Sequence, residues 1–116
     1  MIVVDASVVG KWLFRDEVRA TYAATLLSNA VDTGERICAP LLVAFEATNF
    51  IRQRMVREGL SLALAHDLVD EFLALPLTLI SVPPLHHDAL TLCDAHLLPA
   101  AYDAHYVALA QHLSCP

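Results

Sequence analysis

The chain begins with Ile2-Val3-Val4-Asp5-Ala6-Ser7, a short apolar run that ends in a carboxylate. Consecutive β-branched residues of this kind are typical of a strand that is buried on both faces of a parallel sheet. Ligands of open α/β sheets gather at the carboxyl ends of the strands, so Asp5 stands where a functional site is expected. The alternative interpretation is that Asp5 only caps the turn that follows the strand.

Outward from this stretch, short strand patterns alternate with longer helical ones. The predicted strands cover residues 2–4, 36–39 and 77–82. The predicted helices are a first one capped by Ser7, then 18–30, one that begins at Pro40 and stops at Gly59, 61–75, one that Pro83-Pro84 opens and that carries Cys93, and 102–113. Strands that are separated by helices imply right-handed crossovers and a parallel sheet covered on both faces. We therefore predict a single α/β domain over residues 1–116.

The composition supports one folded domain without a membrane segment. The 116 residues are 57% hydrophobic, which provides enough material for one core and excludes a disordered or collagen-like chain. The three cysteines form no C-x-x-C pair and cannot make a closed set of disulfides, so a reducing cytoplasm is the expected location. No apolar stretch reaches the length of a membrane span, and the first residues lack the pattern of a signal peptide.

The charge is distributed unevenly along the chain. Thirteen acidic residues against seven basic ones give a net charge of −6, which opposes simple electrostatic binding of nucleic acid. A nucleic-acid function would therefore need metal ions or a local basic surface. Such a surface would be formed by Lys11, Arg15, Arg52, Arg54 and Arg57, and the alternative is that these residues are ordinary solvated helix surface.

Two further acids stand out from their surroundings. Glu46 lies within an apolar helical pattern, where a charge is costly unless it is paired or bound to a metal. Asn49 continues a polar seam one turn later, and the alternative partner for Glu46 is Arg52 or Arg54. Asp103 begins the last predicted helix, where an acid is often just a cap.

Three carboxylates acquire a common function if the fold brings them together. Asp5, Glu46 and Asp103 would then repel one another, and a divalent cation would relieve that repulsion. Oxygen ligands select Mg²⁺ or Mn²⁺ over Zn²⁺, and such sites activate water and neutralise charge on a phosphate. The pattern therefore indicates phosphoryl chemistry.

Three blocks of the sequence resemble the PIN domain. They are Val3-Val4-Asp5-Ala6-Ser7, then Ala39-Pro40 followed by Glu46 and Asn49, and finally Tyr-Asp-Ala-His-Tyr-Val-Ala-Leu-Ala at residues 102–110. Their order and spacing agree over essentially the whole chain, and the similarity is greatest to VapC-type toxins of toxin–antitoxin pairs. The resemblance implies a three-layer α/β/α fold with a central parallel sheet flanked by helices.

The resemblance also implies an activity, the hydrolysis of RNA by a metal-dependent endoribonuclease. It assigns Asp5, Glu46 and Asp103 to catalysis and to binding of Mg²⁺ or Mn²⁺. Ser7 matches a hydroxyl that supports the metal site, and Asn49 matches a polar companion of the helical acid. These five residues are the predicted site.

The implied partners are an RNA substrate, an antitoxin protein and a second copy in a homodimer. Lys11, Arg15 and Arg52 are the residues that we expect to contact RNA. The family pattern continues into a further strand that carries a fourth acid, which would lie beyond Pro116. On that pattern the chain is expected to be truncated at its C-terminus, without one or two strands and one metal ligand.

The absent fourth acid motivates a rival hypothesis from another class of proteins, a catalytically silent PIN-like module that docks an antitoxin or another partner. Other chemistries have less support. A soft-metal site would combine His86, His87, Cys93 and His96, of which only the last two share a helical face. An Asp-nucleophile phosphatase would carry a second acid where Ser7 stands, and no nucleotide-binding glycine motif is present.

Overall fold

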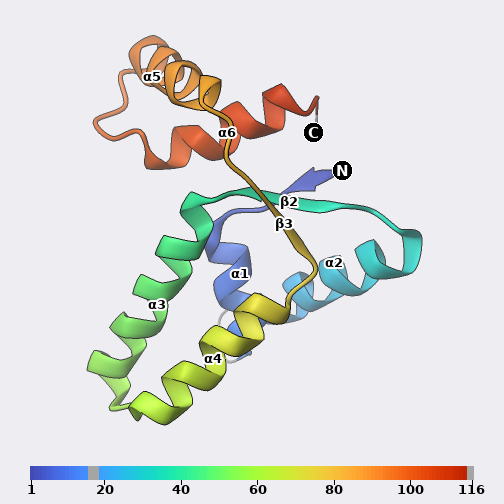
Figure 1. The fold of residues 1–116 in the computed structure, drawn as a ribbon, viewed down its shortest axis with the longest axis vertical. Helices are drawn as coiled ribbons and strands as arrows, with labels where there is room; N and C mark the ends of the chain where they lie inside the picture. The colour runs from blue at the N-terminus through green and yellow to red at the C-terminus, as the bar shows by residue number, and fades with distance from the viewer. Residues whose placement is uncertain (16–18, 115–116) are drawn as a thin grey trace.

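The computed structural model describes residues 1–15 and 19–114, over which strands and helices alternate as predicted (Figure 1). The strands are β1 (Ile2–Val3), β2 (Ile37–Pro40) and β3 (Leu77–Ile80). The helices are α1 (Ala6–Leu13), α2 (Ala20–Thr33), α3 (Leu42–Glu58), α4 (Leu62–Ala74), α5 (Pro84–His96) and α6 (Tyr102–His112). None of the helices in these two described ranges is both long enough and apolar enough to cross a membrane.

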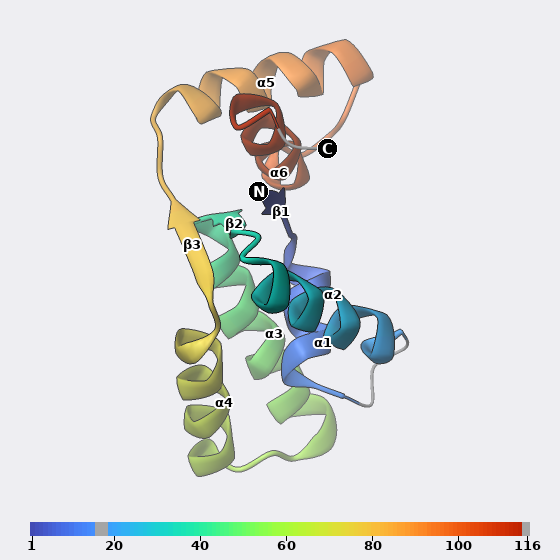
Figure 2. The ribbon, with the colours of Figure 1, turned by 90° about the vertical axis from the view of Figure 1, so that its right-hand side faces the viewer.

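The strands form one parallel sheet in the order β1-β2-β3. Ile37 at the start of β2 lies opposite Ile2 of β1 on one side and Leu77 of β3 on the other. Figure 2 shows α1 to α4 on one side of this sheet and α5 with α6 on the other. The predicted three-layer α/β/α fold is therefore confirmed.

Two predicted starts of helices are wrong. The N-cap of α1 is Asp5, not Ser7, because Oδ1 of Asp5 accepts a hydrogen bond from the backbone N–H of Val8 and another from the Ser7 hydroxyl. Pro40 does not begin a helix but ends β2, since the next backbone N–H, that of Leu41, donates to the carbonyl of Ile80 and extends the pairing with β3.

Two other boundaries concern the second helix and the third strand. The predicted start of the second helix at residue 18 lies outside the described residues, and α2 begins at Ala20. The third strand ends at Ile80, earlier than predicted, because the carbonyl of Val82 already accepts the N–H of Leu85 in the turn that leads into α5. These shifts leave the order of elements unchanged.

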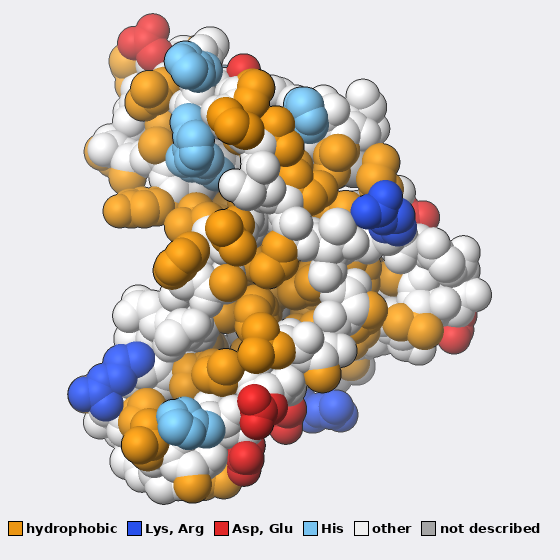
Figure 3. Space-filling model, viewed as in Figure 1, with side chains coloured by type: hydrophobic (Ala, Val, Ile, Leu, Met, Phe, Trp, Pro, Cys, Tyr) orange, Lys and Arg blue, Asp and Glu red, His pale blue; other side chains and the backbone are white. Residues whose placement is uncertain are grey.

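Basic side chains are distributed unevenly between the two helical layers. The sequence of α5 and α6 contains no Lys or Arg, whereas α1 and α3 together carry Lys11, Arg52, Arg54 and Arg57. In the view of Figure 3, no Lys or Arg side chain is seen at the top of the molecule, and those that are seen lie at the right and toward the bottom. The helices α1 to α4 also carry six acidic residues, so the first helical layer is not a positively charged surface as a whole.

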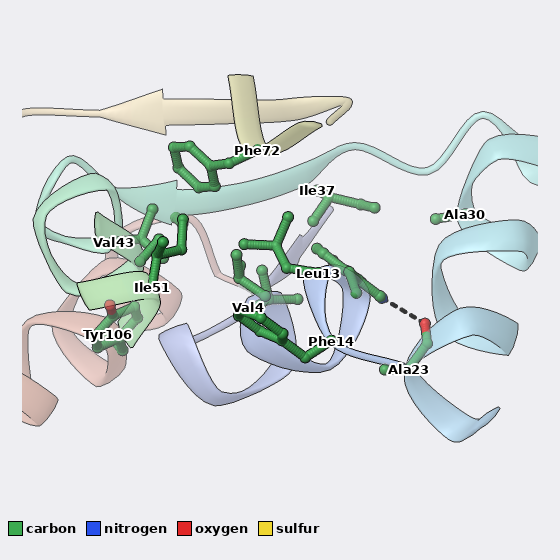
Figure 4. Packing of buried hydrophobic residues seen from close by; sticks show 14 of the residues in the cluster. Val4, Leu13, Phe14, Ala23, Ala30, Ile37, Val43, Ile51, Phe72 and Tyr106 are labelled. Atoms are coloured by element: carbon green, nitrogen blue, oxygen red, sulfur yellow. Dashed lines mark hydrogen bonds between the residues drawn. The ribbon is translucent and has the colours of Figure 1, made fainter. Parts of the chain in front are cut away.

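The main core lies between the sheet and the helices α1 to α4 (Figure 4). Val9 of α1 and Val43 of α3 are completely buried, and burial of each such side chain contributes about 1.5–3 kcal/mol. Trp12 joins α1 to α2, because its indole N–H donates to the carbonyl of Ala23 at 2.6 Å. This core fixes the helices that follow β1 and β2.

A smaller cluster holds α5 and α6 against the opposite face of the sheet. Leu85, Ala108 and Leu109 are buried there, and Val3 and Ile80 of the sheet pack against them. Helix α6 contacts both β1 and β2. The start of α6 is thereby held near the ends of these two strands.

Helices α1 and α3 pack unusually closely, and one cation is part of that packing. A Cβ atom on Gly10 would lie 3.1 Å from the ring of Phe50, so a larger residue would displace that ring. Arg54 is buried, with its guanidinium 4.2 Å from the centroid of the Phe14 ring and 2.7 Å from Oε1 of Glu58. The suggestion that Arg54 belongs to an RNA-binding surface is therefore wrong, because this side chain is an element of the core.

Candidate functional site

The three acids singled out in the sequence occupy the ends of three different elements. Asp5 follows β1 and caps α1, Glu46 lies in the second turn of α3, and Asp103 lies in the first turn of α6. Asp5 and Asp103 are exposed, and Glu46 is half-buried. All three lie toward the edge of the sheet at which β1 and β2 end.

Tyr106 connects these carboxylates. Its side chain is buried and its hydroxyl donates to Oε1 of Glu46 at 2.5 Å, which joins α6 to α3. Burial raises the pKa of this hydroxyl far above its usual value, and the hydrogen bond and charge of Glu46 add to the effect, followed by the charges of Asp5 and Asp103. Tyr106 therefore contacts Glu46 directly and lies within electrostatic range of Asp5 and Asp103.

The hydrogen bonds of the acids leave oxygen atoms available. Oδ1 of Asp5 accepts from the Ser7 hydroxyl at 2.6 Å and from the Val8 N–H at 3.2 Å. Within residues 1–15 and 19–114, Oδ2 of Asp5, Oε2 of Glu46 and both carboxylate oxygens of Asp103 accept no hydrogen bond. Each acid can therefore present at least one oxygen to a ligand.

The carboxylate oxygens of these acids suit a divalent cation, but the described side chains do not come together as a set of metal ligands. Among the described residues, no three His, Cys, Asp or Glu side chains are close enough to hold a metal ion together. Hard oxygen donors suit Mg²⁺ or Mn²⁺, so the assignment of Asp5, Glu46 and Asp103 as metal ligands stays a prediction.

A shallow groove runs between α3 and the start of α6. Glu46, Asn49 and Asp103 line it together with the apolar side chains of Leu42 and Phe45, and its volume is about 440 Å³. Asn49 is exposed and lies one turn after Glu46. We call this groove the acidic groove, and it brings Asn49 together with two of the three acids.

The predicted partner of Glu46 and the predicted RNA contacts lie elsewhere. Neither Arg52 nor Arg54 pairs with Glu46. The hydroxyl of Tyr106 donates to this carboxylate instead, and Arg54 pairs with Glu58. Arg52 is exposed but lies about 120° around α3 from Glu46, since six residues separate them at about 100° each. RNA contact by Arg52 therefore stays a prediction that this geometry does not favour.

The other two basic residues lie on a different groove. Lys11 and Arg15 line a surface between α1, α2 and α4 together with Glu71. The ammonium group of Lys11 lies 3.4 Å from the carbonyl of Ser7, within its own helix. The structure thus places Asn49 with Glu46 and Asp103, and Ser7 with Asp5, but it does not place Lys11 or Arg15 on the acidic groove.

Tyr106 and a pair of histidines are polar features of this region to which the sequence pattern assigned no function. Tyr106 follows Asp103 by three residues and so shares its side of the helix, which is the one signal that could have identified it. Nδ1 of His86 lies 3.0 Å from Nε2 of His105, and these residues come from different helices. His86 therefore pairs with α6, and not with the other members of the soft-metal set.

The comparison with known families decides the class of the protein. The sequence pattern of the PIN domain matches residues 2–116. The chain belongs to the PIN-domain family. PIN domains are nucleases that typically depend on divalent metal ions, which agrees with a group of carboxylates at the carboxyl edge of a parallel sheet. No curated protein matches this PIN domain closely enough to count as a relative.

Tyr106 makes the stability of the PIN domain depend on alkaline pH. Its pKa in the folded state is raised above the value of about 10 in the unfolded chain, so the native state keeps a proton that the unfolded state releases. The stabilisation is complete below about pH 10 and is lost as the pH rises toward the folded pKa. We expect this residue to lower the free energy of unfolding by up to about 1.4 kcal/mol per pH unit above pH 10.

Urea unfolding on either side of about pH 10 measures this effect. The Tyr106→Phe variant should lose this component of the pH dependence, whereas Tyr102→Phe, at an exposed position, should keep it. An equal alkaline slope for the parent chain and Tyr106→Phe would contradict the prediction.

Proposed function

We propose that this PIN domain is a metal-dependent endoribonuclease of the VapC type, the toxin of a toxin–antitoxin pair. The observation that carries the proposal is that Glu46 and Asp103 lie together in the acidic groove and that Tyr106 holds Glu46 by a hydrogen bond. Family membership provides the nuclease class. The toxin assignment rests on the resemblance of the three sequence blocks that contain these acids.

The carboxylates are suited to the chemistry of a phosphodiester. Hydrolysis forms one bond from water oxygen to phosphorus and breaks the bond to a sugar oxygen, which leaves with a proton. A bound Mg²⁺ or Mn²⁺ supplies an acidified water and neutralises charge on the phosphate. Asp5, Glu46 and Asp103 would hold the ion through the oxygens that accept no hydrogen bond within the described part of the chain.

Two neighbours fix the directions of these ligands. The Ser7 hydroxyl holds Oδ1 of Asp5, and the Tyr106 hydroxyl holds Oε1 of Glu46. Because the pKa of Tyr106 is raised, this phenol remains a hydrogen-bond donor at all physiological pH values. Partners of this kind orient metal ligands, and their loss commonly costs about 10- to 100-fold in metal affinity or activity.

The proposal includes two protein partners, an antitoxin and a second copy of the chain. Large apolar side chains are more than two-thirds exposed at Val56, Leu73 and Leu97. Surfaces with such side chains are often covered by other proteins in the cell. Co-purification with an antitoxin and the mass of the chain in solution are the observations that bear on these partners.

The test is cleavage of single-stranded RNA by the 116-residue chain with Mn²⁺, compared with EDTA and with DNA of the same sequence. We expect RNA fragments with Mn²⁺ and none in EDTA. Circular dichroism establishes that the assayed chain is folded. A folded chain that cleaves no RNA with Mn²⁺ would refute the proposal and favour the rival hypothesis of a catalytically silent module that docks a partner.

A further inference from the structure

A second pocket adjoins the acidic groove and differs from it in chemistry. It opens at the carboxyl ends of β2 and β3 and is lined by apolar residues at these ends and just beyond them, among them Pro40, Ile80 and Val82. Its volume of about 400 Å³ falls in the range of small-molecule sites. We call it the base pocket.

The base pocket and the acidic groove share one wall. Leu42, Phe45 and Tyr102 line both of them. Phe45 directly precedes Glu46, and Tyr102 directly precedes Asp103. A ligand that occupied both would therefore have one part against these side chains and the other beside the carboxylates. Figure 3 shows hydrophobic side chains along the indentation at the left of the view, below a group of histidines.

The two aromatic rings of the shared wall are not used in the core. Phe45 is 68% exposed and Tyr102 is 65% exposed, although both lie next to a pocket in which they could be covered. Flat aromatic faces at the mouth of a pocket suit a flat ligand. Single-stranded RNA is recognised mainly by stacking of its unpaired bases on such side chains.

The histidine pair, His86 of α5 and His105 of α6, gives the pocket a polar edge. Nδ1 of His105 lies 2.7 Å from the carbonyl of Ala101, which can only accept, so this nitrogen carries the hydrogen. In the neutral pair Nε2 of His105 then accepts from Nδ1 of His86. Nε2 of His86 is left as an acceptor, which matches the N–H groups on the edge of a nucleobase.

We propose that the base pocket holds one nucleobase of the RNA strand whose phosphate lies at the acids. The base stacks on Phe45 and Tyr102 and directs its hydrogen-bonding edge toward His86. This inference deepens the proposed function and rests on it for the identity of the polymer. Continuity with the acidic groove, exposed aromatic rings and a histidine acceptor favour a base over an apolar helix, which would leave that acceptor unpaired.

Backbone NMR titration with the four nucleoside 5′-monophosphates in Mg²⁺ tests the base pocket, and ribose 5-phosphate serves as the ligand without a base. We expect at least one nucleotide to shift the amide signals of Phe45, Val82 and His86 in a saturable way, and ribose 5-phosphate to leave them unchanged. Phe45→Ala and Tyr102→Ala should each weaken binding by about tenfold. The matched control is Tyr22→Ala on α2, an aromatic residue that is 78% exposed and distant from the pocket, and it should bind like the parent.

The same titration of Asp103→Asn separates this inference from the nuclease proposal. Base binding should persist in that variant, because the aromatic wall is intact. A chain that binds nucleotides in this way but cleaves no RNA would refute the nuclease proposal and leave the pocket standing. Two results would overturn the pocket: no nucleotide shifts these signals, or they shift with protein concentration and Phe45→Ala weakens self-association, which assigns the surface to a second copy.

Discussion

Replacement of Asp103 by Asn is expected to reduce Mn²⁺-dependent RNA cleavage by at least about 100-fold while the fold stays intact. Asn has the shape of Asp but no charge, so it weakens the attraction for a divalent cation. Asp103 is exposed in the first turn of α6, and within the described residues its carboxylate accepts no hydrogen bond. The lost interaction with the helix dipole should cost less than about 1 kcal/mol of stability.

Initial cleavage rates and calorimetric Mn²⁺ binding are the two measurements for this variant, with Asp32→Asn as the matched control. Asp32 is an exposed acid on α2, in the other helical layer, and its replacement should change neither quantity. Asp5→Asn should resemble Asp103→Asn, because the amide oxygen can still accept the cap hydrogen bond from Val8. Parent-like cleavage by Asp103→Asn would remove this residue from the site.

Replacement of Leu109 by Ala is expected to have the largest effect on stability. Leu109 of α6 is completely buried in the small cluster that holds α5 and α6 against the sheet. A Leu to Ala change at such a position costs about 2–5 kcal/mol, because the lost contacts leave a cavity. The melting temperature should fall by about 10 °C or more. RNA cleavage by this variant should also decrease, even at temperatures below its melting temperature, because α6 carries Asp103 and Tyr106.

Thermal unfolding followed by circular dichroism measures this change. Leu90→Ala is the control, because Leu90 lies in the same layer on α5 but is 64% exposed. It should alter the free energy of unfolding by no more than about 0.5 kcal/mol. Equal losses for the two variants would show that the second cluster does not hold α6.

Most of the fold was predictable because hydrophobic periodicity separates the strands from the helices. The ends of the strands and helices were less predictable. Asp5 and Ser7 are both good N-cap residues and lie two positions apart, and only the backbone geometry shows that Asp5 reaches the N–H of Val8. Pro40 is common at helix starts, but the pairing of β2 with β3 continues through it.

The site was predictable in its acids and not in the contacts that organise them. The hydrogen bond from Tyr106 to Glu46 joins residues 60 positions apart, and the contact of His86 with His105 joins two helices. No local pattern encodes either one. The burial of Arg54 was easier to predict. Arg54 lies on the same side of the helix as Val43, Ala47 and Ile51, and α3 turns this side toward the core.

The wide separation of the acids along the chain has a consequence for synthesis. Asp5 and Glu46 are synthesised long before Asp103. Glu46 accepts its hydrogen bond only after α6, which carries Tyr106, has packed in place. A nascent chain therefore contains two carboxylates that nothing yet holds together. The proposed arrangement of the three acids therefore forms only after α6 has been synthesised and has packed onto the sheet.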